Sequence, residues 1–428
     1  MDQIQQGNAV LRIRERREEQ AGRILGHLVA LDGTRAIVAT RLGGEGNTAS
    51  WTIGHLVTIV QGSARLVGVV IEISAANHVW SEGEVNVANV KIEMSGEILD
   101  DANGQPVFSR GISNYPELGA VAHRIRSRDL AAIYAFHGGS GVEIGSLSQA
   151  ASIPAVINVE DMLTRHFAVI GSTGVGKTTA VSILLHKCIE QRENLRILIL
   201  DPHNEFAAQF GEQCIVLDVD TLELPYWMFR YEEMMEIIFP GRKPSADEAD
   251  ALHDLIKAAR VRFASGAPGA PPTQQAAVAG AANALRRTTS PVMESNGNIS
   301  ADTPSPYRIT DALKIIDEWT GLLERKFPVT DLRTLKNRFE ALARDPRFRF
   351  MFSKGIVDDN MARVLAKIFR VPHEDKRVTI VQLAGLPNEV VNSVVSVLAR
   401  LSFELCLWSG GGIEVAVVCE EAHRYIPN

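Results

Sequence analysis

An eight-residue segment rich in glycine constrains this chain more than any other feature. It fits the pattern GxxxxGK[ST], and its residues are Gly171, Ser172, Thr173, Gly174, Val175, Gly176, Lys177 and Thr178. Residues 166–170 before it have the composition of a buried strand, and residues 179–191 after it carry apolar side chains at helical spacing. Strand, glycine-rich loop and helix in this order predict a P-loop that binds the phosphates of a nucleoside triphosphate.

The chemistry of phosphate binding assigns expected roles within this loop. Glycine lets successive backbone N–H groups face one anion, and the following helix adds the positive end of its dipole. Lys177 is expected to reach the β- and γ-phosphates of ATP. Thr178 is expected to offer its hydroxyl to Mg²⁺, which prefers oxygen ligands. The predicted cofactors are therefore ATP and Mg²⁺, and the predicted nucleotide-binding residues are the eight above together with Thr179.

A second informative segment is the apolar stretch 413–419, which ends in two carboxylates, Glu420 and Glu421. In nucleotidases of this architecture, one acid beside the phosphate loop holds Mg²⁺ and the other polarises the attacking water. We assign Glu420 to the metal and Glu421 to base catalysis. Adjacent residues of an extended chain point in opposite directions, so the two roles could be exchanged.

A third apolar stretch, 196–200, stops at Asp201 and continues as Pro-His-Asn-Glu-Phe. Ligands of open parallel sheets gather at the carboxyl ends of the strands. Asp201, Glu205, Glu420 and the phosphate loop are therefore expected to converge, and Asp201 is a candidate catalytic residue together with Lys177.

The amino-terminal part has a different texture. Short β-rich pieces at 35–39, 56–60, 66–71 and 87–92 alternate with Gly, Asp and Asn turns, which predicts a small closed β-barrel. Residues 115–120 and 138–141 are expected to form connecting turns. After residue 219 the pattern is helical, with predicted helices at 231–238, 247–263 and 310–327 and Gly/Pro-rich loops at 265–272 and 288–306.

These patterns predict an α/β protein with two parts. Residues 1–140 would form the β-barrel and a linker. Residues 141–428 would form a P-loop core with a mainly parallel sheet and a helical insert at about 230–350. The four cysteines lack metal-type spacing and the amino terminus is charged rather than signal-like. We therefore expect a cytoplasmic protein that does not contact a membrane.

The strings GSTGVGKT, LDPHNEF and VCEEAHRYIP together resemble the HerA family of hexameric ATPases, within the HerA–FtsK superfamily of DNA pumps. The similarity covers roughly residues 155–428. It implies a RecA-like core preceded by a HAS-barrel-like domain, a homo-hexamer, and ATPase roles for Lys177, Thr178, Asp201, Glu420 and Glu421. It also implies further strands and an arginine finger beyond residue 428, so the sequence is expected to be a fragment truncated at its carboxyl end.

The resemblance further implies an ATP-driven translocase or helicase on double-stranded DNA. Its expected partner is a NurA-like nuclease or an effector of anti-phage defence. The alternative is an ATPase assembly platform that regulates a nuclease or a sirtuin-like NADase. The net charge of −7 neither supports nor excludes binding to DNA, since a ring needs basic residues only along its channel. Some basic clusters are candidates for DNA contact, although a solvated helix face is the favoured interpretation of each. They are Arg12, Arg14, Arg16 and Arg17; Arg124, Arg126 and Arg128; and the run 333–349.

Overall fold

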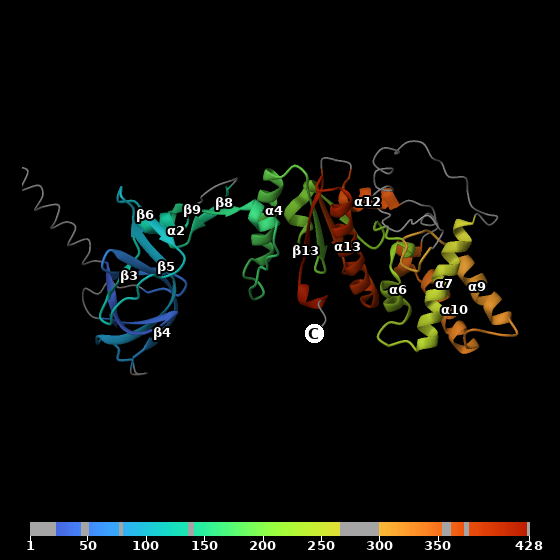
Figure 1. Cartoon of the computed structure of the whole chain (residues 1–428), viewed down its shortest axis with the longest axis horizontal. Coiled ribbons are helices and arrows are strands. Elements are labelled where there is room, and N and C mark those ends of the chain that lie inside the picture. Colours follow the sequence, from blue (N-terminus) through green and yellow to red (C-terminus); the bar gives the residue numbers. More distant parts are fainter. Residues whose placement is uncertain are drawn as a thin grey trace, which may run out of the picture. The chain divides into compact units, whose positions relative to one another are not determined.

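The computed structural model describes residues 23–43, 51–76, 80–135, 141–265, 299–352, 361–371 and 376–425. By its internal contacts the chain divides into two compact units, Met1–Met162 and Leu163–Asn428, which are treated separately below (Figure 1). Three features singled out from the sequence lie outside the described residues. They are the basic cluster at 12–17, residues 138–140 of the expected turn at 138–141, and most of the predicted Gly/Pro-rich loops, namely 266–272 and 288–298.

The first unit contains a closed antiparallel barrel. Its sheet has the order β2-β1-β7-β3-β4-β5-β6, and an additional pairing of β2 with β5 closes it. Closure leaves six strands in the ring, and β6 extends β5 outside it. Buried side chains that include Leu28, Val38, Ile59 and Ile92 fill the interior. The strands are β1 (Ile24–Asp32), β2 (Arg35–Leu42), β3 (Leu56–Gln61), β4 (Ala64–Ala75), β5 (Asn86–Asp100), β6 (Pro106–Ser109) and β7 (Val121–Arg124).

All four predicted barrel strands are present, as parts of β2, β3, β4 and β5. The prediction omitted β1 and β7, which complete the ring between β2 and β3. β7 has only four residues, too few for an alternating pattern to emerge from the sequence. The closed ring satisfies the backbone groups of strands that would otherwise have open edges.

A helix and a hairpin follow the barrel within this unit. They are α2 (Ser127–Ile133) and the strands β8 (Gly141–Leu147) and β9 (Ala150–Asn158), followed by α3 (Val159–Leu163). Leu147 and Ile153 of the hairpin pack against the barrel cluster that contains Ile98. The Gln149 side chain also exchanges two hydrogen bonds with the backbone of Leu56. These contacts group the hairpin with the barrel in the first unit. The predicted start of the core domain at residue 141 stays a prediction.

A buried ion pair attaches α2 to the barrel. The Arg65 guanidinium bonds Asp100 at 2.6 Å and Asp129 at 3.1 Å. Asp129 is 0% exposed. Because Asp129 is removed from water, its charge depends on Arg65 for compensation, with a second contribution from Arg128 at 3.8 Å.

We therefore expect Asp129→Ala to destabilise the first unit by about 2 kcal/mol, since Arg65 keeps Asp100 but loses its buried partner. Urea denaturation followed by circular dichroism measures this change. The control is Glu72→Ala, which removes the exposed pair with Lys91 and should cost less than about 1 kcal/mol. Equal losses in the two variants would contradict a structural role for the buried pair.

The second unit is built on a parallel sheet of order β11-β12-β10-β13, in which every described pairing is parallel. This confirms the prediction of a mainly parallel sheet. β10 is buried along its whole length because it lies between β12 and β13, as its continuous apolar sequence indicated. The strands are β10 (Leu195–Asp201), β11 (Cys214–Leu217), β12 (Val378–Gln382) and β13 (Glu414–Cys419).

Helices cover this sheet, and α4 and α13 flank it on opposite sides (Figure 1). The α-helices of the unit are α4 (Lys177–Gln191), α5 (Ala207–Phe210), α6 (Tyr231–Ile238), α7 (Ala246–Ala264), α9 (Ile309–Gly321), α10 (Val329–Arg344), α11 (Arg349–Phe352), α12 (Met361–Phe369) and α13 (Asn388–Trp408). Short 3₁₀ helices are η1 (Gly211–Gln213), η2 (Tyr226–Met228), η3 (Pro346–Phe348) and η5 (Ala422–Arg424).

The buried strand predicted at 166–170 is wrong in this structure. These residues form no strand, and Phe167, Val169 and Ile170 are exposed, Ile170 to 92%. A strand needs a neighbour for its backbone groups, and within the described residues β13 pairs only with β10. The apolar composition of residues 166–170 predicted a buried strand, but burial of such a strand requires a neighbouring strand to pair with it.

Helices are present at the three positions that the sequence predicted for the insert, and the division into core and insert stays a prediction. The prediction of 231–238 matches α6, and that of 247–263 falls within α7, which begins with a capping box between Ser245 and Glu248. The third predicted helix is too long. α9 ends at Gly321, since glycine disfavours helix and Pro328 fixes the extended approach to α10.

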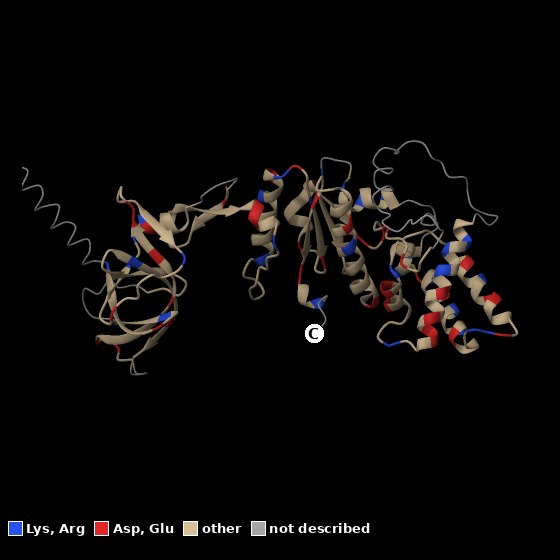
Figure 2. Cartoon of the chain, in the orientation of Figure 1, with Lys and Arg blue, Asp and Glu red and all other residues tan. Residues whose placement is uncertain are grey.

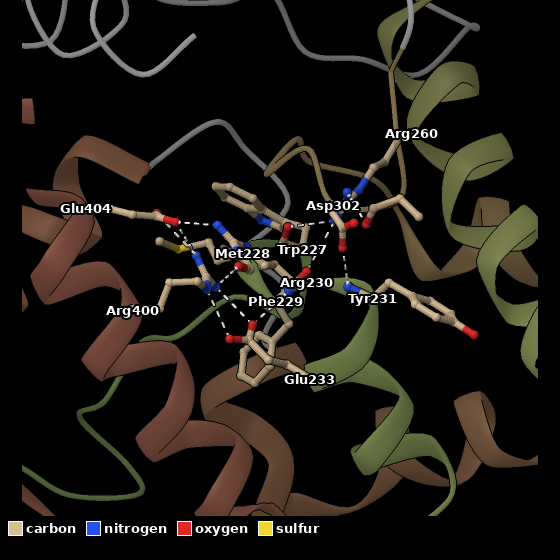
Figure 3. A network of polar contacts seen from close by, with 11 residues as sticks. Trp227, Met228, Phe229, Arg230, Tyr231, Glu233, Arg260, Asp302, Arg400 and Glu404 are labelled. Carbon is tan, nitrogen blue, oxygen red and sulfur yellow. Dashed lines mark hydrogen bonds and ion pairs between the residues drawn. The ribbon is translucent and has the colours of Figure 1, made fainter. Parts of the chain in front are cut away.

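Polar contacts fasten the insert to the core helix α13 (Figure 3). Arg400 of α13 donates two hydrogen bonds to Glu233 of α6, at 3.0 and 2.9 Å, and another to the Met228 carbonyl at 2.9 Å. Glu404, one turn further along α13, accepts from Arg230 at 2.8 Å. The segment 228–233 is thereby held against α13 at several points.

Among the described helices, α13 alone has the length and hydropathy that a membrane span requires. Half of its most apolar window is buried inside this unit, as expected for a core helix. Val390, Val394, Leu398 and Leu405 belong to the main hydrophobic cluster. Packing accounts for this buried half of α13, whereas Phe403 and Leu407 of the same helix are exposed.

Candidate nucleotide and metal site

The glycine-rich loop has the backbone shape that its sequence predicts. Gly174 and Gly176 have φ values of 81° and 92°, which side-chain-bearing residues rarely adopt. A Cβ at Gly171 would lie 2.7 Å from the Val175 side chain. Gly176 is the N-cap of α4, and its carbonyl accepts the first helical hydrogen bond from Ala180 at 2.9 Å. The loop therefore leads directly into a helix N-terminus.

The two residues that open α4 make different contacts. The Lys177 ammonium donates to the carbonyl of Ser172 in the same loop, at 3.3 Å. The Thr178 hydroxyl donates to a carboxylate oxygen of Glu205 at 2.7 Å. Ser172, Thr173, Val175 and Thr179, the remaining predicted nucleotide-binding residues with side chains, are exposed.

Asp201 shapes the loop that follows β10. It is 0% exposed, and one carboxylate oxygen accepts from the backbone N–H groups of His203 at 3.1 Å and Glu205 at 3.3 Å. The other oxygen accepts from the N–H of buried Phe206 at 3.0 Å. Asn204 adopts a left-handed conformation with φ 60°. The buried carboxylate thus fixes the turn that carries Glu205.

Glu420 follows β13 and lies beside the end of β10, since its N–H donates to the Leu200 carbonyl at 3.2 Å. Burial raises the pKa of its carboxyl to about 8, helped by the hydrogen bond that the protonated form makes with Asp201. The charges of Asp201, Glu205 and Glu421 act in the same direction. One Glu420 oxygen is buried and has no hydrogen-bond partner.

Glu421 occupies a strained position. Its backbone has φ 48° and ψ 48°, in the left-handed region that a non-glycine residue seldom adopts. The chain turns here from β13 into η5, and the Arg424 N–H donates to the Glu421 carbonyl at 2.8 Å. The Glu421 carboxylate lies 3.3 Å from Nδ1 of His423. His423 had no functional signal in the sequence beyond its place two residues later.

The residues present fit a divalent cation that is shared with nucleotide. No group of three or more His, Cys, Asp or Glu among the described residues could hold a metal by itself. Mg²⁺, however, commonly takes one or two protein oxygens and completes its shell with water and phosphates. A buried, unpartnered Glu420 oxygen surrounded by other carboxylates is an environment that a cation would neutralise.

At the carboxyl ends of the strands the structure brings together part of the expected set of residues, and their roles stay predictions. The structure joins Thr178 to Glu205 and Glu420 to Asp201, and the charges of Glu205 and Glu421 act on Glu420. Lys177 makes its described hydrogen bond within its own loop instead. Three segments distant in the sequence thus contribute to one polar cluster beside the helix N-terminus.

Residues 142–402 match the family described as the central domain of the helicase HerA, and this is more than half of the chain. The chain belongs to the HerA family. Its resemblance to P-loop ATPases of the HerA–FtsK type is thereby confirmed.

Curated relatives match over shorter segments. A probable helicase of Methanocaldococcus jannaschii, MJECL08, is 35% identical over 91 residues, which is 21% of this chain and 17% of that protein. The DNA double-strand break repair helicase HerA of Pyrococcus furiosus is 33% identical over 70 residues, 16% of this chain and 12% of that protein. These matches span less than a fifth of either relative.

Among solved structures, VirB4 of Thermoanaerobacter pseudethanolicus is similar with a TM-score of 0.37 and 11% identity. The similarity covers 68% of this chain and 70% of VirB4. At this level it adds nothing to the family assignment.

The basic run at 333–349 is largely engaged within the fold. Arg338 donates to the carbonyl of Ile238, and Lys336 pairs with Asp317. Arg344, Arg347 and Arg349 pair with Glu340, Asp345 and Asp220. Figure 2 shows that the Lys and Arg of these helices alternate with Asp and Glu. This run fits the interpretation as a solvated, ion-paired surface.

Proposed function

We propose that this chain is an ATP-driven motor of the HerA type that moves along double-stranded DNA as a ring of six subunits. The observation that carries the proposal is a chain of contacts at the ends of the strands: Thr178 of the phosphate loop bonds Glu205 after β10, and Glu420 after β13 bonds Asp201. A P-loop without acidic partners can bind ATP, whereas hydrolysis needs groups that handle metal and water. Membership of the HerA family and the names of its relatives support a DNA substrate.

Each residue of the site would take one part of the chemistry. The backbone of Gly171–Gly176 and the N-terminus of α4 would hold the phosphates, and Lys177 would swing from its loop carbonyl toward the β- and γ-phosphates. Mg²⁺, held by Thr178 and Glu420, would neutralise phosphate charge. Glu421 would accept a proton from the attacking water, and Asp201 would keep the surrounding loop in place.

The finer architecture belongs to the same proposal. The parallel sheet and P-loop would form a RecA-like core, with the barrel and hairpin of the first unit as a separate domain and helices of about 230–350 as an insert. A nuclease or another effector would be the partner, and the cytoplasm the compartment. These features are what the resemblance to the HerA family implies for this chain.

The proposal predicts that linear duplex DNA stimulates steady-state ATP hydrolysis several-fold, because translocation couples turnover to the DNA track. Hydrolysis is measured with and without DNA, together with the native mass. Lys177→Ala, the matched control, should lose both basal and stimulated turnover, since the phosphates lose their cation. A ring of six whose turnover ignores DNA would contradict a translocase and favour an assembly platform.

A further inference from the structure

The hydrogen bond between Thr178 and Glu205 links the phosphate loop to the turn after β10, 2.7 Å across a gap of 27 residues in sequence. A threonine hydroxyl has one proton to donate and two lone pairs to offer. An ionised carboxylate can only accept. The proton of Thr178 therefore lies on its bond to Glu205, and the lone pairs of the hydroxyl oxygen are left to face a cation.

Glu205 is held in position although its side chain is exposed. Its N–H donates to the buried carboxylate of Asp201, and the next residue, Phe206, is both bonded to Asp201 and buried in the core. Asn204 before it adopts the left-handed conformation that the tight turn needs. The backbone that carries the Glu205 side chain is thus fixed, which restricts the positions that its carboxylate can take.

We infer that Glu205 is a positioning residue that orients the Thr178 hydroxyl toward the Mg²⁺ of the bound nucleotide. The inference rests on the proposed function, which supplies the metal. A carboxylate that accepts the proton of a metal ligand fixes the orientation of that ligand and makes its oxygen a better donor to the metal. Asp201 supports the same arrangement through the backbone of the turn.

The consequence is specific to the metal. Partners of this kind typically change metal affinity by about 10- to 100-fold when removed. Nucleotide binding without Mg²⁺ depends on the backbone N–H groups of the glycine-rich loop, the Lys177 ammonium and the dipole of α4. The described side-chain contact of Glu205 is with the Thr178 hydroxyl, which is the group expected to face the metal. Removing Glu205 should therefore weaken Mg²⁺ and leave metal-free nucleotide binding unchanged.

The experiment measures the affinity of the full chain for a fluorescent ATP analogue, first in EDTA and then across a titration of Mg²⁺. The variants are Glu205→Ala and Glu205→Gln. The control is Glu190→Ala, at the other end of α4, which removes a surface pair with Lys187. We expect Glu205→Ala to raise by about 10- to 100-fold the Mg²⁺ concentration that gives half of the maximal change in affinity for the analogue. Glu205→Gln should have a smaller effect, since its amide oxygen can still accept the proton. Glu190→Ala should match the wild type.

Three results would overturn the inference. In the first, Mg²⁺ changes the affinity of the wild type for the analogue, and it changes the affinity of Glu205→Ala to the same extent. Glu205 would then have no part in the metal site, and the proposed function would stand. An equal loss of affinity with and without Mg²⁺ in Glu205→Ala would show that Glu205 only maintains the loop. Failure of the wild-type chain to bind the analogue under any condition would overturn the proposed function as well.

Discussion

Glu421→Gln is expected to reduce the rate of ATP hydrolysis by about 10²–10⁴-fold while ATP still binds, because a neutral amide cannot accept a proton from water. The substitution preserves the size of the side chain at a backbone position whose left-handed conformation sets the turn from β13 into η5. It also leaves the phosphate loop untouched. Single-turnover hydrolysis of radiolabelled ATP, with a parallel measurement of ATP binding, separates the chemical step from affinity.

Two comparisons sharpen this expectation. Glu212→Gln, in the exposed η1 helix, is a control for loss of an acidic side chain and should hydrolyse ATP at the wild-type rate. Glu420→Gln should act mainly on Mg²⁺ dependence, since Glu420 has the buried, unpartnered oxygen. If instead Glu420→Gln abolished the chemical step and Glu421→Gln altered only the metal requirement, the two roles would have to be exchanged.

The sequence located the parts of this site because each part has a local signature. The glycines needed positive φ, the apolar strands ended in carboxylates, and parallel strands bring such ends to one edge. The sequence could not reveal which acid contacts which group. Asp201 was expected to act in catalysis, and whether it does stays a prediction, yet its three backbone hydrogen bonds show a structural task. These hydrogen bonds depend on the conformation of the turn after β10, which the sequence pattern does not specify.

The fold shows the same division between local and non-local information. Helices with clear capping and periodicity, such as α6 and α7, were predicted within a residue or so at each end. The barrel strands β1 and β7 were missed, and residues 166–170 were assigned a strand that is absent. In both cases the deciding factor is pairing with a distant strand, which is set by the whole sheet and not by the segment itself.

Arg260→Ala is expected to destabilise the second unit by about 3–5 kcal/mol. Arg260 is 1% exposed, and its guanidinium donates to the carbonyls of Ala301 at 2.6 Å and Trp227 at 3.1 Å (Figure 3). The guanidinium also lies 5.8 Å from the centre of the Tyr307 ring. Alanine would leave buried carbonyls without donors and a cavity between α7 and the segment that α13 holds.

The matched control for Arg260 lies two residues along the same helix. Arg262 pairs with Glu318 at the surface, and Arg262→Ala should cost less than about 1 kcal/mol. Arg260→Lys should recover only part of the loss, since an ammonium cannot reach both sets of carbonyls as a planar guanidinium does. Guanidinium denaturation gives the stabilities, and amide hydrogen exchange around residues 299–307 locates the loss. Equal stabilities for the two alanine variants would mean that the insert does not depend on this buried arginine, and that the contacts of Arg400 with Glu233 suffice to hold it.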